Sequence, residues 1–146
     1  MIRLVPATPE DAGDYVRIGA RTSSRFNRVI TDPAAAAQEI EASTTYMIEV
    51  DGQRVGYISY RRPASDHAYI DEVQVDPDFQ GRGIGSFALG AVLDQLQAVP
   101  LVDLHTHPEN PAQNLYRRHG FQATGELVEN YDGTGEPRVR MVWAKS

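Results

Sequence analysis

The sequence predicts an α+β fold, in which a mixed and mostly antiparallel sheet of seven strands is flanked by about four helices. Two capped helix starts follow the first apolar segment, a hairpin signal opens a run of three strands, and helical periodicity separates the later strands. The chain has 146 residues, of which 41% are hydrophobic and 23% charged. This size and composition suit one domain, so we expect residues 1–146 to form a single unit.

The N-terminal part of the chain predicts one strand and two helices. Residues 2–5 have the pattern of a short strand. Thr8 is a typical helix cap, Pro9 suits the first helical position, and two acidic residues follow in the first turn. Asp32 and Pro33 repeat this signal before an alanine-rich segment. The expected helices cover residues 9–21 and 33–43.

Three consecutive strands follow as a meander. Asp51 and Gly52 separate two segments that are rich in β-branched and aromatic residues, which is a strong signal for a hairpin. A polar loop then leads to a third segment of the same kind. The expected strands cover residues 45–50, 54–61 and 68–75.

The C-terminal half alternates helices and strands. Apolar residues recur at helical spacing until Pro100 ends the segment. The positions of this stripe are Ile84, Phe87, Ala88, Ala91, Val92, Leu96 and Val99. Asn110 suits the cap of a last helix, with Gln113 at the capping-box position and Gly120 at its end. The expected strands in this half cover residues 101–106, 121–127 and 138–144.

The composition excludes several classes of protein. A formal net charge of −6 argues against a general nucleic-acid binder, whose affinity would rest on Lys and Arg neutralising phosphates. No apolar run approaches the length of about 18 residues that a membrane span requires, and no secretory signal is present. With no cysteine, the chain has no disulfide and no thiol nucleophile. We therefore expect a cytoplasmic protein with no membrane or nucleic-acid partner.

The segment DPDFQGRGIG, residues 76–85, precedes a helix and carries glycine at three alternate positions. Glycine lets the backbone approach a ligand closely, and the first amides of a helix lack intrahelical partners. Together with the helix dipole these amides form an anion site, to which Arg82 can add a charge-assisted contact. The segment therefore predicts a phosphate site, and a pyrophosphate suits it best.

Two other phosphate-binding motifs fit the segment less well. The P-loop motif requires a lysine, and Lys145 is the only lysine in the chain. The dinucleotide fingerprint is matched from Gly83 to Ala88, with Asp103 about 20 residues further on, where a ribose-binding acid would belong. That match lies mid-chain behind a hairpin meander, whereas a dinucleotide fold places it after a first parallel strand.

In two motifs the chain resembles the GCN5-related N-acetyltransferase (GNAT) superfamily. QGRGIG, from Gln80 to Gly85, matches the acetyl-CoA motif Q/R-x-x-G-x-G/A and follows a strand that ends in Val-Asp-Pro. NPAQNLYRRHGF, residues 110–121, matches the later motif N-x-A-x-x-L-Y-x-x-x-G-F. The two motifs lie about 30 residues apart. The expected order of elements along the whole chain also resembles that of the family.

The resemblance implies an acetyl-CoA-dependent N-acetyltransferase that moves an acetyl group to a primary amine by direct attack in a ternary complex. In this family the fourth and fifth strands splay apart, and the pantetheine arm pairs with the fourth strand. The amide of Val73 would stabilise the oxyanion of the thioester carbonyl. The implied cofactor-binding residues are Val73, Gln74, Val75, Gln80, Gly81, Arg82, Gly83, Ile84, Gly85, Ser86 and Asn110, with Asn114 as the alternative to Asn110.

The implied reaction needs a proton acceptor for the amine and a proton donor for the departing thiolate. Tyr116 matches the motif tyrosine that lies near the CoA sulfur in many relatives, so it is the candidate donor. Asp71 and Glu72 are the candidate bases. The choice between them is open, because neighbours on a strand face opposite sides unless a bulge intervenes. Tyr69 stands where histone-acetylating relatives carry a glutamate, which argues against histone-type chemistry.

The resemblance also implies where the acceptor binds. Its pocket would lie between the first two helices and the last hairpin, and we expect a small-molecule amine. The candidate acceptor residues are Arg25, Phe26, Arg28, Glu129, Tyr131 and Asp132. A non-catalytic acyl-CoA-binding or regulatory module is the alternative function. His105 and His107 lack a clear third ligand, so no metal site is expected. Dimers are common in the family, which makes a homodimer one option.

Overall fold

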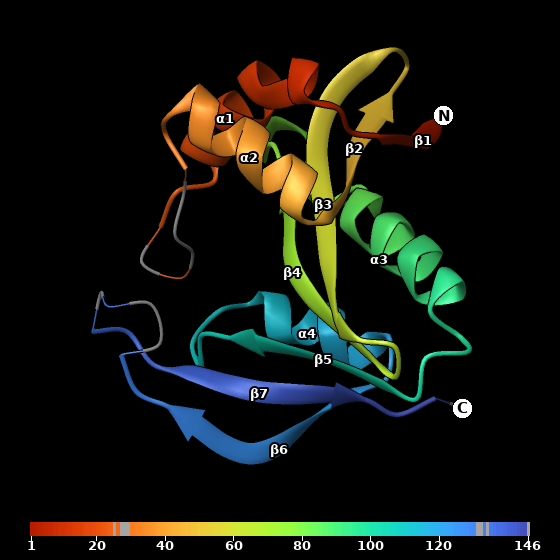
Figure 1. The fold of residues 1–146 in the computed structure, drawn as a ribbon, viewed down its shortest axis with the longest axis vertical. Helices are drawn as coiled ribbons and strands as arrows, with labels where there is room; N and C mark the ends of the chain where they lie inside the picture. The colour runs from red at the N-terminus through yellow and green to blue at the C-terminus, as the bar shows by residue number, and fades with distance from the viewer. Residues whose placement is uncertain (25, 27–29, 131–132, 134, 146) are drawn as a thin grey trace.

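The structure is a computed structural model that describes residues 1–24, 26, 30–130, 133 and 135–145. Its strands form one seven-stranded sheet in the order β1-β2-β3-β4-β5-β7-β6, with all neighbours antiparallel except β4 and β5 (Figure 1). The predicted fold class is therefore confirmed. The strands are β1 Ile2–Pro6, β2 Thr44–Val50, β3 Gln53–Ala64, β4 His67–Val75, β5 Leu101–Thr106, β6 Phe121–Val128 and β7 Arg138–Trp143.

The second helix begins at Pro33, as the capping signal at Asp32 indicated. The first begins at Ala12, later than expected, because Pro9–Asp11 form a 3-10 turn, and the last begins at Ala112, one residue after Pro111. The Asp11 carboxylate accepts a hydrogen bond from the Thr8 amide at 3.0 Å, and Asp32 accepts one from the Ala34 amide at 3.3 Å. None of the helices within the described ranges is long and apolar enough to cross a membrane. The helices are α1 Ala12–Arg21, α2 Pro33–Ala42, α3 Ile84–Gln95 and α4 Ala112–Arg118, and short 3-10 turns cover Pro9–Asp11 and Pro77–Phe79.

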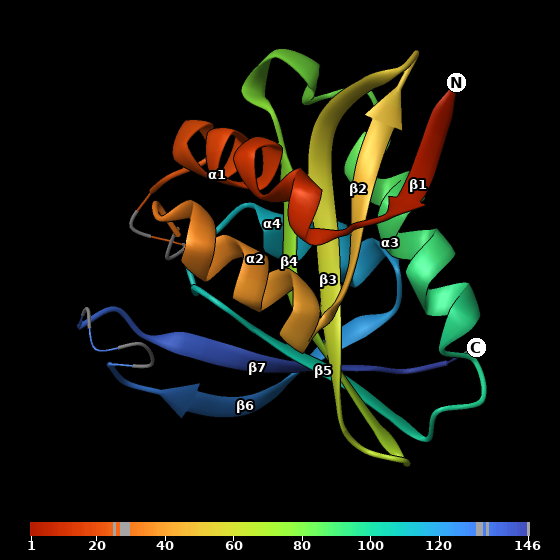
Figure 2. The same cartoon turned by 45° about the horizontal axis from the view of Figure 1, so that its top comes forward.

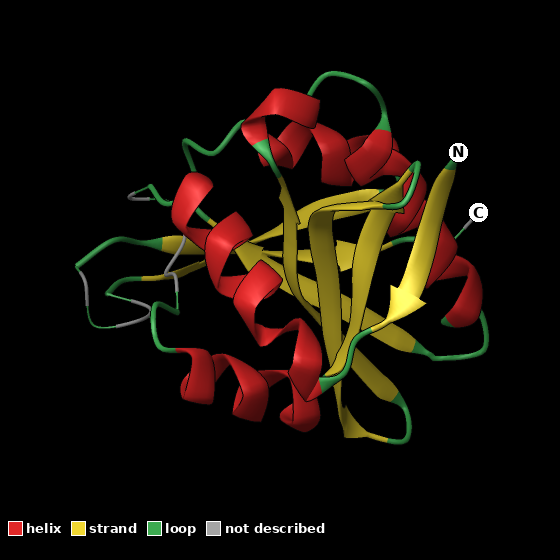
Figure 3. Cartoon of the chain, turned by 90° about the horizontal axis from the view of Figure 1, so that it is seen from above, coloured by secondary structure: helices red, strands yellow, loops and turns green. Residues whose placement is uncertain are grey.

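The helices lie on both faces of the sheet. Helices α1 and α2 cover one face of β2, β3 and β4, and α3 and α4 lie behind the sheet (Figures 2 and 3). The larger apolar core fills the space between the sheet and α3, where Ile58, Ile70 and Leu89 are buried. A smaller core under α1 and α2 contains Tyr15 and Tyr57. Strand β4 thus carries one apolar face toward α3 and a second face toward α1 and α2.

Strands β4 and β5 are neighbours along only part of their length. His67, Ala68 and Tyr69 pair with Leu101 to Asp103, and no pairing between the two strands follows in the described chain. Beyond Tyr69, β4 continues for six more residues with β3 on one edge and no strand on the other. The predicted splay between the fourth and fifth strands is therefore confirmed, and it opens the middle of the sheet.

Three local expectations differ from the structure. Helix α3 ends at Gln95, because three-residue turns bring Leu96 and Val99 into the core instead of a continued helix. Phe87 is 47% exposed, although it was expected on the buried stripe. The capping box at Gln113 is also wrong. The side-chain amide of Gln113 donates to the His107 carbonyl, which also accepts from the Asn110 amide.

Candidate active site

A cleft of about 1410 Å³ opens where β4 and β5 part. One end is lined by the glycine loop and the first turn of α3, and the other end by α2 and the segment that follows α1. The C-terminal half of β4 forms one side, and the end of β5 with α4 forms the other. The cleft residues that the sequence predicted are Asp71, Glu72, Val73, Gln74, Val75, Gln80, Gly81, Gly83, Ile84, Gly85, Ser86, Asn110 and Tyr116.

The glycine loop needs glycine at two of its three positions for conformational reasons. Gly81 and Gly83 have φ values of 79° and 76°, in the left-handed region that side chains other than glycine rarely adopt. A Cβ atom added to either would meet nothing within 4 Å, so the loop presents bare backbone to open space. Gly85 lies inside α3, where a Cβ would make ordinary contacts at 3.7 Å. The backbone shape thus favours close approach of a ligand to Gly81 and Gly83.

A bulge in β4 turns two neighbouring carboxylates to the same face of the sheet. Ser59 on β3 pairs with Glu72, and the next residue of β3 pairs with Ile70, so Asp71 is an extra residue without a partner in the ladder. Glu72 contacts Tyr15 of α1, and Asp71 contacts Arg61, which also bonds Glu39 of α2, so both carboxylates face these two helices. The alternation that would have separated them is therefore broken at Asp71.

Glu72 lies in surroundings that favour its protonated form. Burial raises its pKa to about 7, and the charges of Asp71 and Glu39 act in the same direction. The Tyr15 hydroxyl opposes this shift by donating to Glu72 Oε2 at 2.7 Å, and Arg61 opposes it by its charge. Glu72 is therefore a carboxylate that can gain or lose a proton near neutral pH.

Asp71 is held by a cation in a way that Glu72 is not. Arg61 Nε donates to Asp71 Oδ2 at 3.1 Å, and the same guanidinium bonds to Glu39 on α2. Burial raises the pKa of Asp71, Arg61 lowers it and the Glu39 charge raises it again. Asp71, Arg61 and Glu39 form a connected wall of the cleft with a formal charge of −1.

Tyr116 lines the cleft on the side opposite β4. Its ring packs edge-on against Phe121 with centroids 6.0 Å apart, which fixes the side chain on α4. Burial raises the pKa of Tyr116 to about 12, and the charge of Glu72 adds to the shift. Tyr116 therefore keeps its proton at neutral pH and can act as a donor.

The remaining predicted residues lie at the end of the cleft that is formed by the glycine loop and the first turn of α3. Gln80 Nε2 donates to the Val75 carbonyl at 2.9 Å, which joins the loop to the end of β4. Ser86 Oγ lies 2.8 Å from His119 Nε2, and Asn110 Oδ1 accepts from the Ala112 amide at 2.9 Å. Arg82 is not among the lining residues, because its guanidinium donates to the Asp78 carbonyl and lies over the Phe79 ring.

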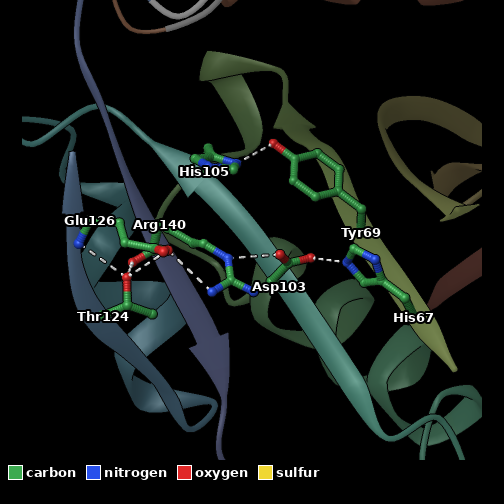
Figure 4. A network of polar contacts seen from close by, with 7 residues as sticks. All are labelled: His67, Tyr69, Asp103, His105, Thr124, Glu126 and Arg140. Atoms are coloured by element: carbon green, nitrogen blue, oxygen red, sulfur yellow. Dashed lines mark hydrogen bonds and ion pairs between the residues drawn. The ribbon is translucent and has the colours of Figure 1, made fainter. Parts of the chain in front are cut away.

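Tyr69 and His105 line the cleft together, a pairing that the sequence did not predict. The Tyr69 hydroxyl and His105 Nδ1 lie 2.9 Å apart where the strands separate (Figure 4). Burial lowers the pKa of His105. Nothing in the sequence links two residues 36 positions apart, although alternation along β5 puts His105 on the same face as Asp103. In the same figure, Asp103 joins His67 on β4 to Arg140 on β7 at 2.5 and 2.9 Å.

Of the residues predicted to bind the acceptor amine, the structure describes Phe26 and Glu129. Phe26 lines the cleft and packs against the buried His107 ring, with centroids 4.9 Å apart. Glu129 is exposed and is not a lining residue. His107 Nε2 lies 2.6 Å from Glu136 Oε2, and His107 Nδ1 accepts from the Glu109 amide, whereas His105 pairs with Tyr69. The acceptor candidates outside the described residues are Arg25, Arg28, Tyr131 and Asp132.

Residues 18–121 match the profile of the Acetyltransferase (GNAT) family. This chain belongs to the GNAT family. It is 38% identical to L-2,4-diaminobutyric acid acetyltransferase of Nocardia farcinica (strain IFM 10152) over 90 residues, which cover 56% of this chain and 47% of the relative. It is 33% identical to mycothiol acetyltransferase of Clavibacter michiganensis subsp. michiganensis (strain NCPPB 382) over 125 residues, 79% of this chain and 40% of that protein. The GNAT chain thus spans about half or less of these curated relatives.

Solved GNAT structures share the fold of this chain. The crystal structure of the ribosomal-protein-S18-alanine N-acetyltransferase from Escherichia coli superimposes with a TM-score of 0.80 at 21% identity, covering 98% of this chain and 93% of that one. A ribosomal L7/L12 α-N-protein acetyltransferase in its apo form gives a TM-score of 0.83 at 17% identity, covering 99% and 90%. At such identity the likeness concerns the fold. The family normally uses acetyl-CoA as its acetyl donor.

Proposed function

We propose that this GNAT protein is an acetyl-CoA-dependent N-acetyltransferase that acts on the primary amine of a small molecule. The observation that carries the proposal is that Glu72 and Tyr116 line the same cleft, one able to accept a proton at neutral pH and the other able to donate one. Glu72, with a pKa of about 7, can accept a proton at neutral pH, whereas Tyr116, with a pKa of about 12, retains one to donate. Acyl transfer to an amine needs both tasks.

The end of the cleft that the glycine loop and α3 form fits coenzyme A, the carrier of the acetyl group. The bare backbone of Gly81 and Gly83 stands before the first amides of α3, where a pyrophosphate can be bound by N–H groups and the helix dipole. The backbone of β4 from Val73 to Val75 lies on the edge from which β5 has parted, so it can pair with the amides of a pantetheine arm. When bound, acetyl-CoA supplies the acetyl thioester.

The reaction uses the two candidate groups in turn. Glu72 accepts a proton from the ammonium group of the acceptor, and the amine nitrogen then attacks the thioester carbonyl carbon. The new C–N bond forms as the C–S bond breaks, and Tyr116 donates its proton to the departing sulfur. The attacking nitrogen gives up its second proton as the amide forms, and that proton restores the Tyr116 hydroxyl. Asp71 is less suited to the role of base because Arg61 holds its carboxylate. With Glu39, it forms a wall of negative charge that attracts the ammonium group.

A small-molecule acceptor is supported by the substrates for which the relatives are named. The relatives with 30% identity or more include enzymes named for diaminobutyric acid and mycothiol, and a spermidine acetyltransferase of Escherichia coli (strain K12) matches at 23% identity. The protein N-acetyltransferases among the solved structures share the fold at lower identity than the first two relatives. A cytoplasmic location and a homodimer stay predictions.

The test measures acetyl-CoA-dependent thiol release across amino acids, diamines, polyamines and amino sugars, with calorimetric CoA binding beside it. We expect turnover on at least one class. Glu72→Gln should reduce kcat/KM by roughly 10²-fold or more with little change in CoA affinity, since it removes only the base. Glu41→Gln, an exposed residue of α2 outside the cleft, is the matched control.

Each other result has a definite meaning. CoA binding without turnover on any amine would favour a non-catalytic acyl-CoA-binding module. Absence of CoA binding would overturn the assignment of the glycine loop. Full activity in Glu72→Gln would remove Glu72 as the base and return that role to Asp71.

A further inference from the structure

Behind Glu72, on the side away from the cleft, lie two buried tyrosines, Tyr15 and Tyr57, that do not line the cleft. Tyr15 on α1 is 1% exposed and is not a lining residue, yet its hydroxyl donates to Glu72 Oε2 at 2.7 Å. The Tyr15 ring is stacked on Tyr57 of β3, with centroids 4.0 Å apart and planes inclined by 18°. The hydroxyl is therefore presented to Glu72 by a ring that has little freedom to move.

Helix α1 is attached to β4 at a second point. Arg21 Nε donates to Asp76 Oδ2 at 2.9 Å, and Arg21 also pairs with Asp78 at 3.1 Å. Asp76 is 6% exposed and stands directly between β4 and the glycine loop. Two contacts from one helix, Tyr15 to Glu72 and Arg21 to Asp76, thus hold α1 against both ends of the cleft-lining half of β4.

We propose that Tyr15 is a positioning residue for acetyl transfer, whose hydroxyl holds one oxygen of Glu72 so that the other oxygen meets the amine in the cleft. The inference rests on the proposed role of Glu72 as the base. A carboxylate that accepts a hydrogen bond from a fixed hydroxyl has fewer rotamers to sample, and its charged form is stabilised. Tyr15 therefore sets both the direction in which Glu72 accepts a proton and the pH at which it does so.

The groups around Glu72 leave Tyr15 as its direct hydrogen-bond donor among the contacts of the described chain. The titratable and charged groups that affect Glu72, or that its charge affects, come from five elements. They are Asp71 on β4, Tyr57 and Arg61 on β3, Tyr15 on α1, Glu39 on α2 and Tyr116 on α4. Arg61 is engaged by Asp71 and Glu39. Burial raises the pKa of Tyr15 and of Tyr57, so both stay protonated while Glu72 titrates.

The test compares pH profiles of kcat/KM for wild type, Tyr15→Phe and Tyr46→Phe. In the wild type, the plot of kcat/KM against pH should have an ascending limb centred near pH 7, where Glu72 loses its proton. Tyr15→Phe removes the donor that favours the carboxylate, so the limb should move up by about one pH unit, and activity at pH 7 should fall several-fold. Much of that loss should be recovered at pH 9.

Tyr46→Phe is the matched control for the loss of a tyrosine hydroxyl. Tyr46 donates to Gln95 of α3 at 3.1 Å, on the face of the sheet opposite α1, and it does not line the cleft. The Tyr46→Phe limb should stay in place. A carbon-13 NMR titration of the Glu72 carboxyl in Tyr15→Phe should show the same upward shift without any substrate, which separates the effect from changes in turnover.

The outcomes distinguish this inference from the proposed function. If Glu72→Gln abolishes turnover but Tyr15→Phe lowers activity equally at all pH values, with an unmoved carboxyl titration, Tyr15 is only structural and the inference fails. If Glu72→Gln remains active, the proposed base fails first. If Glu72 is the base and Tyr15 positions it, Tyr15→Phe should cause no further loss of kcat/KM in the Glu72→Gln background, since both residues act through the Glu72 carboxylate.

Discussion

At the scale of single residues, Asp71 and Glu72 lie on the same face of the sheet but have different hydrogen-bond partners. A cation holds Asp71, whereas Glu72 has a neutral hydroxyl as its partner, so the second carboxylate is the easier one to protonate. Burial is the main cause of the raised pKa in both. A half-buried carboxylate whose pKa is raised above its unfolded value also weakens the fold when it is charged.

This reasoning predicts a stability effect of Glu72→Gln that is independent of activity. The folded protein binds the Glu72 proton up to about pH 7, whereas the unfolded chain loses it near 4.5. Stability from this group is therefore full below pH 4.5 and is lost as pH rises through 7. At pH 8 Glu72→Gln should be more stable than wild type by roughly 1–3 kcal/mol, with little or no gain at pH 4.5. Urea unfolding at both pH values checks this, and equal effects at both would contradict the raised pKa.

At the scale of elements, the glycine loop joins β4 to α3 through two left-handed residues. Gly83 precedes the first residue of α3, so its φ of 76° determines how the helix and its first amides point. The open space beside it means that the backbone geometry, and not crowding, requires glycine. A side chain there would strain the turn and would also stand where a ligand approaches.

Gly83→Ala should therefore have two separable effects. The left-handed backbone should make the variant less stable by roughly 1 kcal/mol. CoA affinity measured by calorimetry should fall by roughly tenfold or more, because the Cβ intrudes on the anion site. Gly52→Ala is the matched control, since Gly52 has a φ of 84°, no neighbour within 4 Å and a place in the β2–β3 turn. A loss of stability in both variants with CoA affinity unchanged in both would leave the loop without a binding role.

The elements themselves could be predicted from the sequence to a large extent. Local signals were sufficient for this, because Thr8, Asp32 and the turn at Asp51 and Gly52 act through near neighbours, and both turn residues have positive φ as a hairpin of this type requires. Both candidate bases and the candidate donor could be named from the family resemblance. Their order of preference could not, because strand alternation assigns Asp71 and Glu72 to opposite faces and only the bulge overrides it.

Residues that act through distant partners were outside the reach of sequence reasoning. Tyr15 contacts Glu72 across 57 positions, and a tyrosine on the buried face of α1 has the pattern of an ordinary core residue. Arg61 and Glu39 are 22 positions apart on different elements. Such pairs depend on tertiary packing, for which one sequence offers no local signal.

At the scale of the whole molecule, the sheet consists of two parts that meet along a short seam. The seam is the parallel pairing of β4 with β5 over residues 67–69, and a line of polar side chains adds to it. Asp103 joins His67 on one side to Arg140 on the other, and Asp103 is 4% exposed. These side-chain contacts therefore add to the three paired backbone positions that join the two parts of the sheet.

Asp103→Asn should show how much the seam contributes. Among the residues that the structure describes, loss of the buried charge leaves Arg140 with the exposed Glu126 as its ion partner, and we expect the free energy of unfolding to fall by roughly 2 kcal/mol. Asp51→Asn removes a fully exposed pair with the N-terminal amine and should change little. Urea unfolding at pH 7 compares the two. An equal and negligible effect of both would mean that backbone pairing alone maintains the seam.

The bulge at Asp71 also has a consequence for how this protein can change. Without residue 71, strict alternation would be restored, with Ile70 and Val73 toward α3 and Glu72 toward α1. The pairing of Ile70 and Glu72 with β3 would be the same without Asp71, because Asp71 has no partner in that ladder. Deletion of this one residue would therefore remove a negative charge from the wall of the cleft and leave the register of the strands unchanged.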